Sequence, residues 1–169
     1  MLKNVRDLLS PDPYYAGTAG FIGSSLESLH SDVSLLNLPD YVPEPVRHFH
    51  DAVRNAYVYS YFSYDLLKLA AGETFPCLEL ALRLRVGYQF AGRVTRKGKP
   101  NPPMLSELLE TAQNQNLIAG NVKLLARLRN MFAHGSDTIL NPPMFLDPFK
   151  LVTGLIVDLF DPDKNPSTP

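Results

Sequence analysis

The stretch NVKLLARLRNMFAHG, residues 121–135, has the residue spacing of a helix that packs inside a helical bundle. At about 3.6 residues per turn, it has a broad apolar face made of Leu124, Leu125, Leu128, Met131 and Phe132. A polar face carries Lys123, Arg127, Asn130 and His134. Between the two faces, a narrow stripe of small residues is interrupted by Arg129, and Gly135 is placed to end the helix.

Three polar residues of this stretch form a chemically useful set. The guanidinium of Arg129 can bind phosphate oxygens through paired N–H donors, and the imidazole of His134 can exchange a proton near neutral pH. Asn130 lies one turn before His134 on the same face and can orient the ring. On an ideal helix Arg129 and His134 point about 140° apart, so two copies related by a twofold axis would combine them better than one copy. The alternative is structural, with a solvated arginine and a histidine that favours the helix C-terminus.

The run LARLRNMFAHG (125–135), the loop NPPM (141–144) and the apolar segment 149–160 together resemble the HEPN (higher eukaryotes and prokaryotes nucleotide-binding) superfamily. The family motif of arginine, a polar residue, variable positions and histidine matches Arg129, Asn130 and His134. The resemblance covers residues 43–160, including VRNAYVYSYFSYDLL and CLELALRLRV upstream. It implies an all-α bundle that forms a homodimer in which the motif helix takes part.

The resemblance also implies a function, namely a metal-independent endoribonuclease with no cofactor and RNA as its substrate. His134 would act as general base or acid, Arg129 would stabilise the phosphorane, and Asn130 would fix the imidazole. The 2′-hydroxyl of RNA would attack, leaving a 2′,3′-cyclic phosphate. The alternative is a non-catalytic module that binds RNA, a nucleotide or a partner protein, as in toxin–antitoxin or defence systems with a cognate nucleotidyltransferase antitoxin. A helical dimerisation domain without a ligand is a third possibility.

Composition favours one ordinary globular domain. The chain has 169 residues, of which 45% are hydrophobic and 20% charged, and its net charge is −1. Such a charge gives no basic field over the whole protein, so RNA would need a local basic patch. A single cysteine excludes a disulfide framework and a cysteine-rich zinc site. With no signal peptide at the N-terminus and no long apolar run, the expectation is a cytoplasmic protein that does not contact a membrane.

The pattern along the chain predicts an all-α, single-domain bundle of roughly five to seven helices. Residues 1–42 form an N-terminal helical extension packed on the bundle, residues 43–160 form the bundle itself, and residues 161–169 form a disordered acidic and proline-rich tail. Helices are predicted at 25–37, 43–71, 74–91, 104–113 and 121–133. A last helix is predicted to be capped by Asp147 and to open at Pro148.

Local basic charge is concentrated in the loop GRVTRKGKPNPP (92–103), because no acidic residue occurs between Arg83 and Ser106. The candidate RNA-binding residues are Arg93, Arg96, Lys97, Lys99, Lys123 and Arg127. Glu79 is either a brace for Arg83, four residues later, or an acid that orients groups in the shared site. His48 and His50 are two residues apart and diverge on a helix, which argues against a metal pair. Both are expected at the surface or at an interface.

Overall fold

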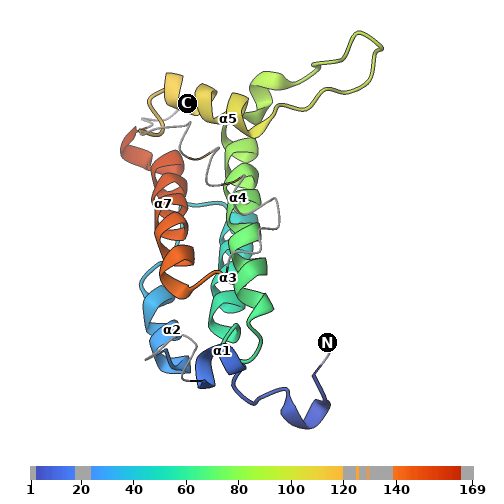
Figure 1. Cartoon of the computed structure of the whole chain (residues 1–169). Coiled ribbons are helices and arrows are strands. Elements are labelled where there is room, and N and C mark those ends of the chain that lie inside the picture. Colours follow the sequence, from blue (N-terminus) through green and yellow to red (C-terminus); the bar gives the residue numbers. More distant parts are fainter. Residues whose placement is uncertain (1–2, 18–23, 120–124, 126–128, 130–138, 165–169) are drawn as a thin grey trace.

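The computed structural model describes residues 3–17, 24–119, 125, 129 and 139–164. That part of the chain is helical, which confirms the all-α prediction (Figure 1). It contains six α-helices: α1 (Pro13–Ala16), α2 (Leu26–Ser34), α3 (Glu44–Tyr59), α4 (Asp65–Val86), α5 (Leu105–Asn114) and α7 (Pro142–Phe160). Short 3-10 turns are η1 (Val5–Asp7), η2 (Gly87–Phe90) and η3 (Pro162–Lys164). The only β pairing within the described ranges is an isolated bridge between Val94 and Pro100.

Helix α4 is the central element of the bundle. It packs against α3 and α7 along its length and against α5 near its C-terminal end (Figure 1). Its apolar residues point to several sides, because α3, α5 and α7 each cover a different part of its surface. The core divides into two clusters along this helix. One contains Leu78, Leu82 and residues of α5 and α7, and the other contains Leu67 and residues of α1, α2 and α3.

The division between α3 and α4 corrects the helices predicted at 43–71 and 74–91. The chain turns at residues 60–64, and α4 then continues without a break through Pro76. Ser60 Oγ donates a hydrogen bond to Tyr57 O at 2.6 Å and contacts Tyr15 Oη at 2.8 Å, so a distant hydroxyl helps to hold the turn. Pro76 is tolerated because it lies on the exposed side of the helix, where water can bind the carbonyl that it leaves without a partner.

The last helix also begins earlier than predicted. Asn141 is its N-cap, with Oδ1 accepting from Met144 N at 3.0 Å, and Pro142 occupies the first turn. Asp147 and Pro148 therefore lie inside α7 and do not open it. The predicted cap at Asp147 lies six residues too late, because Asn141 followed by Pro142 is itself a helix start.

Asp12 connects the N-terminal segment to the turn between α3 and α4. Its Oδ1 caps α1 at Tyr14 N (3.2 Å), its Oδ2 accepts from Tyr64 N (3.0 Å), and its own N–H donates to Tyr61 O (2.8 Å). The carboxylate thus satisfies two backbone donors from parts of the chain that are far apart in sequence.

Asp12→Ala should lower the free energy of unfolding by about 2 kcal/mol, because it leaves both donors without their carboxylate partner. Urea unfolding followed by circular dichroism measures the change. Asp7→Ala is the matched control, because this exposed carboxylate lies in η1 at the same end of the chain. Equal stability of the two variants would contradict the role given to Asp12.

Of the helices in the described ranges, none combines the length and the apolar character that crossing a bilayer would require.

Candidate functional site

A hollow of about 420 Å³ lies where α4, α5 and the end of the 92–103 loop meet. Its walls are formed by Glu79 and Arg83 of α4, by residues 102–106, by Leu109 of α5 and by Arg129. The site therefore contains two guanidinium groups, one carboxylate and an apolar wall. Of the residues singled out from the sequence, the structure brings Arg129 and Glu79 into the same hollow.

Arg129 belongs to a helical part of the chain and is exposed to solvent. Leu125, four residues earlier, is buried in the core cluster shared by α4, α5 and α7. The two residues lie in different environments: Leu125 is buried in the core, whereas Arg129 is exposed and lines the hollow. A guanidinium in this position is available to an anionic ligand from solution.

Glu79 and Arg83 form an ion pair within one helix. Arg83 donates from Nε at 3.0 Å and from Nη2 at 2.6 Å to the same oxygen, Glu79 Oε1. Arg83 Nη2 also donates to Pro103 O at 3.1 Å, which fixes the foot of the 92–103 loop against α4. Glu79 therefore braces Arg83, as one of the two interpretations predicts, and it does so while lining the hollow.

The loop 92–103, which we call the basic arm, projects from the end of the bundle between η2 and α5 (Figure 1). Its two legs pair through the bridge between Val94 and Pro100 and through bonds from Thr95 N to Lys99 O (2.8 Å) and from Asn101 N to Arg93 O (3.0 Å). Gly98 closes the tip with a φ of +71°, which a residue with a side chain rarely adopts. Arg96, Lys97 and Lys99 are exposed on this arm.

Arg93 differs from the other three cations of the arm because it is paired. Its Nη1 lies 2.5 Å from Glu107 Oε1, and Glu107 Oε2 accepts from Met104 N at 2.8 Å. The bond from Met104 N and the bond from Arg93 both hold the pKa of Glu107 below its ordinary value. Arg93 therefore attaches the base of the arm to the first turn of α5.

Four further residues of the predicted site, Lys123, Arg127, Asn130 and His134, lie outside the described residues. The roles given to them stay predictions.

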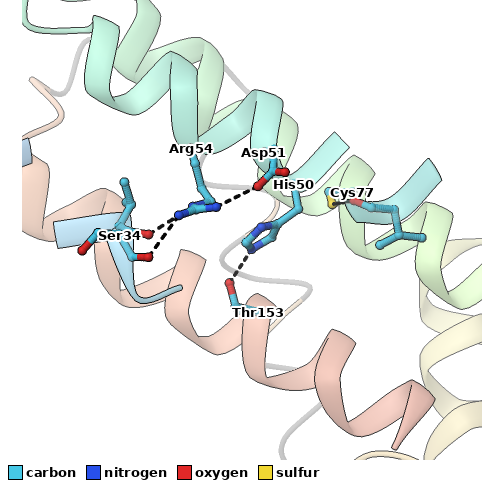
Figure 2. Close-up of polar contacts among 8 residues, drawn as sticks. Ser34, His50, Asp51, Arg54, Cys77 and Thr153 are labelled. Carbon is cyan, nitrogen blue, oxygen red and sulfur yellow. Dashed lines mark hydrogen bonds and ion pairs between the residues drawn. The ribbon is translucent and has the colours of Figure 1, made fainter. Parts of the chain in front are cut away.

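A buried polar cluster lies away from this site, at His50 (Figure 2). Thr153 Oγ1 donates to Phe149 O at 2.8 Å, so its contact with His50 Nε2 at 2.9 Å assigns the proton of the ring to Nε2. The ring also stacks on Phe149, with 4.7 Å between centroids. Burial, and secondarily the nearby Arg54, lower the pKa of His50 to about 4, while Asp51 opposes that shift.

The prediction that His50 lies at the surface or at an interface is wrong, whereas His48 is exposed. The buried face of α3 consists of Val46, His50, Val53 and Tyr57. These residues are spaced four, three and four apart, which is the apolar rhythm of a helix. That spacing was the signal that could have identified His50 as a core residue.

Comparisons with models of known protein families, with curated proteins and with solved structures found no match to this chain. Within the described ranges, no three His, Cys, Asp or Glu side chains are grouped so that they could hold a metal ion.

Proposed function

We propose that the protein is a metal-independent endoribonuclease whose site is shared between two copies of the chain. The observation that carries the proposal is the exposed Arg129 in a hollow at the foot of a basic arm. Arg83 adds a second guanidinium to this hollow, and Arg96, Lys97 and Lys99 lie exposed on the adjoining arm. An RNA backbone following the arm would thus pass its exposed cations and then meet Arg129, although the whole chain is close to neutral.

In this mechanism His134 of one copy accepts the proton of an RNA 2′-hydroxyl, and the 2′-oxygen attacks the adjacent phosphorus. The bond from phosphorus to the 5′-oxygen breaks, and that oxygen takes a proton from the imidazole. Arg129 of the other copy stabilises the negative charge that develops on the phosphoryl oxygens. The products are a 2′,3′-cyclic phosphate and a free 5′-hydroxyl, and Asn130 holds the imidazole in position.

The experiment is incubation of the purified protein with a structured RNA in the presence of EDTA. Cleavage that yields 2′,3′-cyclic phosphate ends would support the proposal, and these ends are identified by mass spectrometry. Replacing the RNA by its 2′-deoxy counterpart should abolish cleavage, because the attacking nucleophile is absent. Cleavage of the 2′-deoxy strand, or no cleavage of any RNA, would contradict the mechanism.

The second candidate is a module that binds RNA without cutting it, alone or together with a partner protein such as an antitoxin. The described part of the site favours this alternative in one respect: the cations of the arm and of the hollow suit phosphate binding and need no acid–base group. A gel shift of RNA without cleavage in EDTA would select the binding module over the enzyme.

Replacing Arg96, Lys97 and Lys99 together by alanine should weaken RNA binding to a similar extent for every sequence. The slope of log K against log salt should become less steep by about 2, since each lost phosphate contact on a single strand contributes about 0.7. Fluorescence anisotropy at several KCl concentrations measures both effects. The control variant replaces Arg6, Lys68 and Lys150 by alanine, which changes the net charge equally but leaves the arm intact. The same salt slope in both variants would show that the arm does not contact RNA.

A further inference from the structure

We infer that the hollow at the foot of the basic arm binds one unpaired nucleotide of a single-stranded RNA and that Glu79 makes it prefer guanine to uracil. This inference rests on the proposed function and specifies its substrate as single-stranded RNA that contains guanosine. The residues that carry it are Glu79, Arg83, Met104, Leu109 and Arg129, together with the two prolines at the end of the arm.

The size and lining of the hollow suit a single base. At about 420 Å³ it falls in the range of pockets that take small molecules, and it is far too small for a duplex. Pro102, Pro103, Met104 and Leu109 give it an apolar wall, and Met104 is 70% exposed although it belongs to that wall. The flat face of an unstacked base would cover this apolar surface. Sequence-specific proteins read RNA in this way, from bases that have left the helix.

The polar groups of the hollow can distinguish between bases. The contacts of Arg83 with Glu79 and Pro103 come from Nε and Nη2, so its two Nη1 donors take no part in them. The Glu79 side chain is 30% exposed and, when ionised, only accepts hydrogen bonds. Guanine presents two adjacent N–H donors on its Watson–Crick edge, which match a carboxylate. Uracil presents one N–H between two carbonyl oxygens, which a carboxylate repels.

The charges around the hollow determine how the rest of the nucleotide would lie. Arg129 forms part of the same lining and is exposed, so it can bind a phosphate next to the captured base. The adjoining strand would then continue along the basic arm. A base captured in the hollow would therefore place a neighbouring phosphodiester within reach of Arg129. In the proposed mechanism, Arg129 is the residue that stabilises the charge on that phosphate.

The test measures binding without cleavage. Short fluorescein-labelled strands with 2′-O-methyl riboses cannot react through the 2′-oxygen, so their anisotropy reports affinity alone. Three probes are compared in EDTA: an all-uridine strand, the same strand with one central guanosine, and the guanosine strand paired with its complement. The wild-type protein should bind the guanosine strand about tenfold more tightly than the uridine strand, which is the discrimination expected of one good two-bond contact to a base edge. It should bind the paired strand more weakly than either.

Two variants locate the effect. Glu79→Gln should remove the preference for guanosine by tightening uridine binding or weakening guanosine binding, and Glu110→Gln on the exposed side of α5 is its control. Met104→Ala should weaken binding of both single strands several-fold by removing part of the wall, and Leu69→Ala, exposed on α4 away from the arm, is its control. Thermal unfolding followed by circular dichroism shows that each variant is folded.

The outcomes separate this inference from the proposed function. If the wild type binds single and paired strands equally, or if Glu79→Gln keeps the guanosine preference, the nucleotide site is wrong even where RNA cleavage is observed. If the guanosine preference is present and depends on Glu79 but no RNA is cleaved, the nucleotide site is supported and the endoribonuclease proposal is wrong. Absence of binding to all three probes overturns the nucleotide site, and the cleavage assay in EDTA then decides the nuclease proposal on its own.

Discussion

Arg129→Ala is expected to lower the rate of RNA cleavage about 100- to 1,000-fold, whereas RNA affinity should fall much less, through the loss of one phosphate contact. This is the size of effect that follows removal of one group aimed at charge that develops in a transition state. Arg129→Lys should rescue little of the rate, because an ammonium cannot bind two phosphoryl oxygens as the planar guanidinium does. Single-turnover cleavage in EDTA and anisotropy with a 2′-O-methyl strand measure rate and affinity separately. Arg6→Ala is the control, because Arg6 is an exposed arginine of η1, near the N-terminus. The N-terminus and α5 lie at opposite ends of the bundle (Figure 1).

A mixing experiment tests whether the site is shared. His134→Ala alone should be as inactive as Arg129→Ala. When the two inactive proteins are mixed and allowed to exchange subunits, half of the dimers contain one copy of each, and one of the two sites in such a dimer is intact. Activity should therefore return to about a quarter of the wild-type value. Mixtures that remain inactive, although subunit exchange is shown by mass spectrometry, would exclude the composite site.

Acidification should destabilise the fold strongly through His50. The pKa of this histidine is lowered from 6.5 to about 4 by its burial, so between those values the unfolded chain binds a proton that the folded protein does not. The free energy of unfolding consequently falls as the pH decreases from 6.5 towards 4. The contribution lost is about 3 kcal/mol, at 1.36 kcal/mol for each pH unit. Urea unfolding at a series of pH values measures the decline, and NMR titration of the imidazole measures the pKa directly.

Variants at two histidines isolate this effect from the carboxylates that also titrate in acid. His50→Gln keeps an N–H donor for Thr153 but cannot be protonated, so its stability should decline less between pH 6.5 and pH 4. His48→Gln, two residues away on the exposed side of α3, should follow the wild type. If the wild type and His50→Gln lose stability in parallel over this range, the lowered pKa is not the cause.

The bundle was predictable because apolar spacing alone shows which faces must be buried. Leu125 is buried, as its place on the predicted apolar face requires, and α5 begins and ends within one residue of its predicted bounds. The boundary between α3 and α4 was not predictable from local pattern. The bonds that hold that turn come from Asp12 and Tyr15, whose approach only the folded chain reveals.

The sequence indicates which residues a site could use, but not the shape of the hollow. The sequence singles out Arg129, Glu79 and the basic loop separately, on grounds of spacing and charge. It gives no sign that Pro103 and Met104 close a hollow against α4, because that contact depends on the hydrogen bond from Arg83 to Pro103 O. The sequence also gives no sign that Arg93 forms an ion pair, because its partner Glu107 lies 14 residues further along the chain. Arg93 was therefore predicted to bind RNA together with the other cations of the arm.

The bonds of Asp12 to the turn after α3 also bear on how the protein should be divided for study. A fragment that starts at residue 43 would contain that turn without the carboxylate and the tyrosine hydroxyl that stabilise it. Only bonds within the turn itself, such as the one from Ser60 Oγ to Tyr57 O, would then oppose fusion of α3 and α4 into one continuous helix. Such a helix would separate the surfaces that α3 and α4 form by packing together, and it could exchange between molecules. Truncation at residue 43 is therefore unsafe, and experiments should keep the N-terminal segment.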